Sequence, residues 1–159
     1  MASHKTAHVS GAVPLAIGAI IGGGTEAEVE ALRNYDLDTG LAFQIQDDLL
    51  NLVGSEESTQ KDFRNDITEG KRTLMVVHAL QHSEDRDRLS DILASKEKDP
   101  AGLAEAVGIM EASGSIDYAR SYAENLTSIA KNRLVDMVRP STSRDLLVSM
   151  ADWFVKRLR

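Results

Sequence analysis

The sequence predicts an all-α protein. A half-buried strand is typically a run of β-branched residues that alternate with polar ones, and the sequence contains no such run of strand length. Glycine, proline and serine clusters instead divide the chain at intervals of roughly one helix length. The chain has 159 residues and no visible internal repeat. That length suits one compact core, so we expect a single helical domain over residues 1–159.

The first half of the chain contains two predicted helices and a loop. The first helix covers about residues 2–21 and ends at three consecutive glycines. Thr25 followed by Glu28 forms a capping box, which predicts the start of a long helix that reaches about Val53. Residues 54–66 show no apolar period and therefore predict a loop.

The second half is predicted to be helical almost throughout. Asp99 followed by Pro100 is typical of a helix entry, with the cap residue first and proline at the first helical position. Pro140 is expected to end the helix that precedes it. The predicted helices cover residues 67–81, 84–95, 100–113, 115–138 and 142–157.

Composition and charge exclude several classes of function. The chain has no cysteine, so it has no disulfide framework and no thiolate metal site. The formal net charge of -7 argues against nonspecific nucleic-acid binding, which needs a basic surface. The most apolar stretch, residues 10–24, is short and interrupted by proline and glycine, so it predicts a buried core helix rather than a membrane span. We expect a cytoplasmic protein.

An oxygen-rich stripe marks the end of the long predicted helix. At about 100° per residue, four polar side chains fall within an arc of roughly 100°, namely Gln44, Asp47, Asp48 and Asn51. Gln46 alone interrupts the apolar remainder, whose width suggests a helix that is buried on most sides. A solvent-facing stripe is the simpler interpretation, but such faces usually carry long side chains of both charges. Short oxygen side chains suit Mg²⁺, which takes one or two carboxylates and keeps several waters.

A mixed charged segment follows this helix. In residues 61–73, "KDFRNDITEGKRT", Lys61 and Lys71 flank Asp66. Such runs are usually solvated surface, yet lysines beside a magnesium-binding helix could also clamp a diphosphate. Near the start of the chain, Lys5 and Thr6 precede the apolar helix, where a lysine either snorkels or reaches into a cavity.

These segments, in this order, resemble the trans-polyprenyl diphosphate synthases, the polyprenyl synthetase family. The resemblance rests on "KTA", on "GLAFQIQDDLLN", which is similar to the family's second aspartate-rich motif FQxxDDxxD, and on "KDFRNDITEGKRTL". It implies an isoprenoid synthase-type helical bundle with a deep cavity. It also implies Mg²⁺-dependent head-to-tail (1′-4) condensation of isopentenyl diphosphate with an allylic diphosphate.

The resemblance also implies roles for the residues of the acidic stripe. Asp47 is the expected direct ligand of a magnesium ion, Asp48 supports the metal site, and Gln44 faces the reacting carbons. Asn51 stands where the family has a third aspartate, so it keeps an oxygen ligand but drops a charge, and we expect weaker metal binding there.

The basic residues receive roles in the same way. Lys5 and Lys61 are expected to bind the allylic diphosphate, and Lys71 to help close the site over it. Thr6 is expected to line the path near the allylic C1 carbon. Arg64 departs from the family pattern, because a glycine is common at that place in the loop.

The family's first aspartate-rich motif, DDxxD with its arginine pair, has no counterpart in this sequence. We therefore expect an incomplete bundle that corresponds to the C-terminal half of a synthase and is inactive on its own. The alternative is a non-catalytic partner in a synthase heteromer. We expect a homodimer, or a heteromer with a chain that supplies the first motif. A terpene cyclase is a poorer match, because Asn51 and Ser55 stand where its second metal motif has serine and glutamate.

Overall fold

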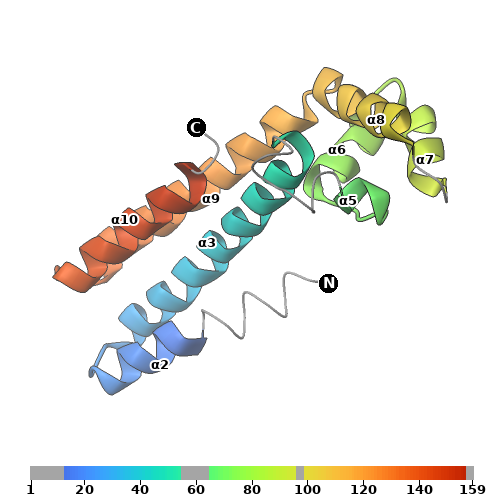
Figure 1. Cartoon of the computed structure of the whole chain (residues 1–159). Helices are drawn as coiled ribbons and strands as arrows, with labels where there is room; N and C mark the ends of the chain where they lie inside the picture. The colour runs from blue at the N-terminus through green and yellow to red at the C-terminus, as the bar shows by residue number, and fades with distance from the viewer. Residues whose placement is uncertain (1–12, 55–64, 96–98, 157–159) are drawn as a thin grey trace. The chain divides into compact units, whose positions relative to one another are not determined.

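The computed structural model describes residues 13–54, 65–95 and 99–156 of the chain (Figure 1). Every regular element in these ranges is a helix, which confirms the all-α prediction. In chain order the helices are α2 (Val13–Ile21), α3 (Glu26–Val53), α5 (Asn65–Thr68), α6 (Leu74–His82), α7 (Arg86–Ala94), α8 (Pro100–Ala112), α9 (Ser115–Met137) and α10 (Thr142–Lys156). None of the helices in the described ranges is long and apolar enough to cross a membrane.

Two predicted helix starts are confirmed in atomic detail. The Thr25 backbone N–H donates to Glu28 Oε2 at 2.9 Å, and the Glu28 N–H donates to Thr25 Oγ1 at 3.3 Å, so the capping box closes reciprocally at the start of α3. At α8, the Asp99 carboxylate accepts from the Gly102 N–H at 2.7 Å, and Pro100 is the first helical residue. Each cap satisfies backbone donors that the first helical turn leaves without partners.

The predicted helix over residues 67–81 is wrong. The structure ends α5 at Thr68 and begins α6 only at Leu74. Gly70 takes φ = 68°, a left-handed conformation that costs glycine little but would strain other residues. Thr73 then caps α6 by accepting from the Val76 N–H at 3.4 Å. A turn therefore separates two helices where the sequence analysis predicted one.

The described residues up to Gln46 and from Tyr122 onward form one compact unit, called unit 1 here. Its buried core joins α3, α9 and α10 through Tyr35, Ala130, Leu134 and Ala151. The Tyr35 hydroxyl donates to the Leu147 carbonyl at 2.7 Å, and burial raises the pKa of Tyr35 to about 12. Trp153 on α10, by contrast, is 59% exposed.

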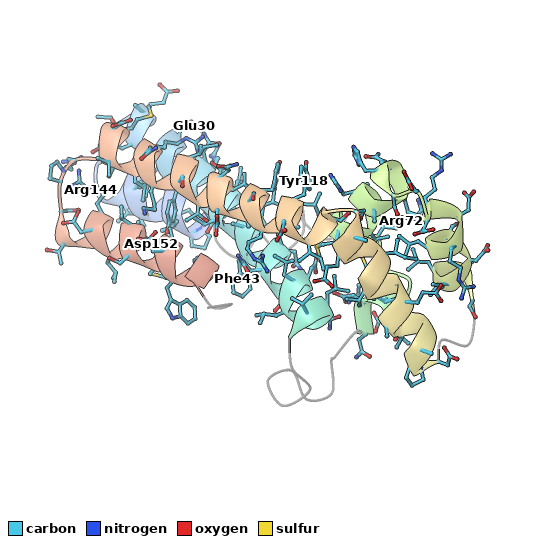
Figure 2. The ribbon with its side chains drawn as sticks, turned by 90° about the horizontal axis from the view of Figure 1, so that it is seen from above. Glu30, Phe43, Arg72, Tyr118, Arg144 and Asp152 are labelled. Carbon is cyan, nitrogen blue, oxygen red and sulfur yellow. The ribbon has the colours of Figure 1, made fainter. Side chains whose placement is uncertain are left out.

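Ion pairs add to the packing of unit 1. Arg139 binds the Glu28 carboxylate with its Nε at 2.8 Å and its Nη2 at 3.0 Å. Lys131 on α9 pairs with Asp152 on α10 at 2.6 Å, and Asp152 is labelled in Figure 2. Arg133 on α9 pairs with Asp38 on α3. Helix α9 is thus tied by charge to both of its neighbours in the unit.

Residues 47–121 form a second compact unit, called unit 2 here. Helices α6, α7 and α8 pack against one another in pairs. The buried apolar side chains of these three helices are Met75, Val76, Ala79, Leu89, Ile92, Ala106, Ile109 and Met110. Whether the two units act as the single domain expected from the sequence stays a prediction.

Candidate functional site

The acidic stripe lies on the last turns of α3. Gln44 and Asp47 are exposed, and Asp48 and Asn51 are half-buried. The buried face of the same turns is formed by Ala42, Ile45, Gln46, Leu49 and Leu52. The polar side chains therefore point away from the core, as their helical spacing predicts.

Two details of this helix differ from the sequence prediction. Gln46 belongs to the buried face, with 2% of its surface exposed. Its side-chain carbonyl oxygen has no hydrogen-bond partner among the described residues. Phe43 and Val53, which the apolar arc placed in the interior, are 36% and 39% exposed. The expected burial on most sides is thus wrong for these turns. Phe43 nevertheless packs edge-to-face on Phe154 of α10, with ring centroids 5.5 Å apart.

Asn51 ties the stripe to the turn that follows it in the sequence. Its side-chain carbonyl oxygen accepts a hydrogen bond from the Asp66 backbone N–H at 3.1 Å. Asp66 lies in the short helix α5, so the contact spans 15 residues of sequence.

Lys71 lies in the turn between α5 and α6 and binds two carboxylates. Its ammonium is 2.5 Å from Asp66 Oδ1 and 3.4 Å from Glu69 Oε2. The hydrogen bond that Lys71 donates to the Asp66 carboxylate raises the pKa of Lys71 above its ordinary value. Most of the Lys71 side chain remains exposed, at 55%, whereas that of Asp66 is only 13% exposed. The lysine can therefore leave its pair for a stronger anion without disturbing the core.

Asp48 and Asp66 line the same small cavity. Its other walls are Leu52, Ile67, Thr73, Met75 and Val76. The structure thus brings Asp48 and Asn51 of the stripe together with the turn that carries Lys71, within unit 2. Asp66 had no role in the sequence prediction, although it opens the pattern "DITEGKRT" that carries Lys71. The 15-residue contact with Asn51 could not be seen in that pattern.

The oxygen donors of the stripe suit a hard divalent cation. Asp47 and Asp48 supply two carboxylates, the number that Mg²⁺ commonly takes from a protein. The described residues contain no group of three or more histidine, aspartate or glutamate side chains placed to hold a metal. Two carboxylates alone would suit a cation that keeps several of its waters.

Three predicted site residues lie outside the described ranges. Lys5 and Thr6 belong to residues 1–12, and Lys61 belongs to residues 55–64. Gln44 is exposed on α3, as expected for a side chain that faces a ligand. The assignments of Lys5, Thr6, Gln44, Lys61, Lys71, Asp47, Asp48 and Asn51 to a prenyl-transfer site stay predictions.

The sequence matches the family model described as polyprenyl synthetase over residues 1–110. A short chain isoprenyl diphosphate synthase from Methanothermobacter thermautotrophicus is 44% identical over 155 residues, covering 96% of this chain and 46% of that protein. A geranylfarnesyl diphosphate synthase from Natronomonas pharaonis is 40% identical over 159 residues, covering 99% of this chain and 44% of that protein. The chain thus spans somewhat less than half the length of these relatives.

Solved structures of isoprenoid synthases share the fold of this chain. A geranylgeranyl pyrophosphate synthase from Corynebacterium glutamicum, complexed with isoprenyl diphosphate and magnesium, superposes with a TM-score of 0.83 at 31% identity, covering 95% of this chain and 43% of that one. A polyprenyl synthase from Caulobacter crescentus, complexed with calcium and isoprenyl diphosphate, gives a TM-score of 0.80 at 31% identity, covering 92% and 45%.

Proposed function

The chain belongs to the polyprenyl synthetase family, and from that premise we propose that it forms one acidic wall of a magnesium-dependent prenyltransferase site. The reaction would be the head-to-tail (1′-4) condensation of isopentenyl diphosphate with an allylic diphosphate. The observation that carries the proposal is the link from the α3 stripe through Asn51 to Asp66 and Lys71. It joins carboxylates suited to a cation with a lysine suited to a phosphate.

Each residue of the wall has a separate task in this proposal. Asp47 and Asp48 hold the metal, with Asn51 as a weaker oxygen ligand. Lys71 leaves Asp66 and Glu69 to bind a diphosphate oxygen, because a diphosphate offers it more negative charge than the carboxylates do. Gln44 presents its amide to the reacting carbons. Lys5, Lys61 and Thr6 complete the diphosphate and C1 contacts.

Bound magnesium supplies the charge that stabilises the departing diphosphate in this chemistry. The chain's own residues position the allylic diphosphate and exclude water from the carbon end. A carbocation formed in a wet cavity would be captured by water, so an apolar enclosure is required for prenyl transfer. The exposed Phe43 and Val53 beside the stripe are suitable surfaces for that enclosure once it is complete.

We also propose that this chain does not turn over substrates alone. The sequence contains no DDxxD motif, so one of the two acidic walls expected for the family has no source here. Orientation of two substrates accounts for much of such catalysis, and half a site provides little of it. The expected partner is a segment or a second chain that supplies the first motif, in a homodimer or a heteromer.

Complementation tests the proposal directly. The chain is assayed with isopentenyl diphosphate, geranyl diphosphate and Mg²⁺, first alone and then joined to the N-terminal portion of the Methanothermobacter relative. We expect product only in the joined protein, with loss of product on Asp47→Ala. Turnover by the isolated chain would contradict the proposal that it carries only one of the two acidic walls. A folded but inactive joined protein would instead favour a non-catalytic partner subunit.

A further inference from the structure

Helix α6 carries two histidines that the proposed prenyl-transfer site does not use. His78 and His82 are separated by one helical turn, so their side chains share a face of the helix. Their rings stack with centroids 4.1 Å apart and planes inclined by 19°. Tyr118, at the start of α9 and labelled in Figure 2, stacks on the other face of His78 at 4.2 Å. All three rings belong to unit 2.

A chain of hydrogen bonds fixes which nitrogen of His78 carries the proton. The Ser113 hydroxyl donates to the Met110 carbonyl at 3.1 Å, so its hydrogen is already used. The 2.7 Å contact between Ser113 and Ser115 must then be donated by Ser115. Ser115 Oγ is consequently the acceptor in its 2.9 Å contact with His78 Nδ1. His78 therefore carries its proton on Nδ1 and keeps the lone pair on Nε2.

His82 is fixed in the same tautomer by the backbone. Its Nδ1 lies 2.9 Å from the carbonyl oxygen of His78, which can only accept. The proton of neutral His82 is thus on Nδ1, and Nε2 again carries the lone pair. Donation of the remote ring N–H to a carbonyl or hydroxyl is the arrangement that orients histidines which bind metals through the other nitrogen.

From these contacts we propose that His78 and His82 chelate a divalent transition-metal ion, such as Zn²⁺ or Ni²⁺, through their Nε2 atoms. Two histidines four residues apart on a helix are a recurrent pair of zinc ligands. Neutral imidazole suits these ions, whereas Mg²⁺ takes oxygen ligands. The described residues provide no cluster of three such ligands, so water fills the remaining positions.

The two histidines contribute differently to chelation. His78 is held by Ser115, by the Tyr118 ring and by its own partial burial, so it is the preorganised ligand. Desolvation, together with the neighbouring His82, lowers the pKa of His78. The stacked planes are nearly parallel, so the two lone pairs do not converge on one point. To bind the shared ion, the exposed His82 ring turns about its Cβ–Cγ bond and gives up its bond to the His78 carbonyl.

Calorimetric titration of the whole chain with Zn²⁺ tests the site. His4 and His8 have the same spacing in the sequence, so the titration uses a His4→Gln, His8→Gln background. We expect one ion per chain, loss of at least about tenfold in affinity on His82→Gln, and a loss of about tenfold on Ser115→Ala, which removes the acceptor that orients His78. Unchanged affinity in both His78→Gln and His82→Gln would overturn the proposal.

Two further measurements separate this site from the acidic stripe and from misfolding. Millimolar Mg²⁺ and Asp47→Ala should leave the zinc titration unchanged. If either abolishes it, the ion binds the stripe and the histidine site is refuted. Nitrogen-15 NMR of His78 and His82, in the background that lacks His4 and His8, should show Nδ1–H tautomers and a zinc-induced shift confined to Nε2. A shift at Nδ1, or none, would contradict the proposed ligation even if a variant failed to fold.

Discussion

Helix α3 carries acidic residues near both of its ends, and the two ends use them differently. Near the start, Glu28 is buried, with 8% of its surface exposed. Its carboxylate accepts hydrogen bonds from Thr25 and from the Arg139 guanidinium. Near the end, Asp47 is exposed and forms no ion pair within the described residues. One carboxylate is saturated by the fold, and the other is left accessible to a ligand.

The comparison separates a structural acid from a candidate catalytic acid by their partners. Hydrogen bonding from Arg139, and then from Thr25, lowers the pKa of Glu28 from 4.5 to about 2. The ionised form of Glu28 is therefore stabilised by groups that belong to the fold itself. The acids near Asn51 meet a movable lysine instead, because Lys71 is mostly exposed while it pairs with Asp66. Exchangeable pairing is what binding of an external anion requires.

The largest effect is expected from Asp47→Ala in the joined, complete protein. Loss of a direct metal ligand removes several kcal/mol of transition-state stabilisation, so the rate should fall by roughly a thousandfold. Because Asp47 is exposed, the melting temperature should hardly change. Initial rates at saturating Mg²⁺ provide the measurement, with Glu26→Ala on the same helix as the matched control. A nearly unchanged rate would remove Asp47 from the site.

Acid unfolding of Glu28→Gln tests the opposite end of the helix. The depressed pKa of Glu28 means that its stabilisation is complete above about pH 4.5 and is lost as the pH falls through about 2. The unsubstituted chain should therefore lose stability steeply in this window, and Glu28→Gln should show a lower melting temperature near neutral pH and a flatter acid dependence. Melting curves by circular dichroism between pH 2 and pH 7 give the answer, and parallel curves would contradict the pairing.

A smaller effect is expected from Lys71→Gln. The exposed ion pair with Asp66 contributes only about 0–1 kcal/mol to stability after solvent screening, so the fold should tolerate its loss. The KM for the allylic diphosphate should rise about tenfold in the joined protein, because one charge-assisted contact is removed. Arg72→Gln, which removes a charge from the same turn, is the control (Figure 2). Equal rises in KM for the two variants would show that Lys71 acts only through the overall positive charge of the turn and not through a specific diphosphate contact.

The smallest effect is expected from Asn51→Asp, which restores the aspartate common in the family motif. The new carboxylate can still accept from the Asp66 N–H, so the tie to α5 should survive. The added charge should lower the Mg²⁺ concentration needed for half-maximal rate by a few-fold. Asn51→Ala, which loses both the ligand and the tie, should raise it. A magnesium titration in which Asn51→Ala shifts and Asn51→Asp does not would show that only the tie matters.

Local signals predicted much of the fold. Thr25 with Glu28, and Asp99 with Pro100, set helix starts through contacts within three residues, and both were confirmed. The prediction joined Ile67 to the apolar run that begins at Leu74 across residues 68–73, none of which has an apolar side chain, and so it missed the break at Gly70. Gly70 at φ = 68° and the cap at Thr73 nevertheless follow ordinary turn chemistry.

The candidate site was less accessible to sequence reasoning. Helical spacing predicted the shared face of Asp47 and Asp48, because that relation is local. The contact between Asn51 and Asp66 depends on how a turn folds back over 15 residues, and no periodicity encodes it. The burial of Gln46 has the same origin, since a polar side chain enters a core only when tertiary packing places it there.

The placement of the aromatic residues makes the two units optically distinguishable. The only tryptophan, Trp153, belongs to unit 1 and is largely open to solvent, while Tyr35 in the same unit ionises only in strong alkali. Tryptophan emission therefore reports on unit 1 and is open to quenching by iodide. Loss of that quenching on adding a complementary chain would show, without any label, that the α10 surface has been covered.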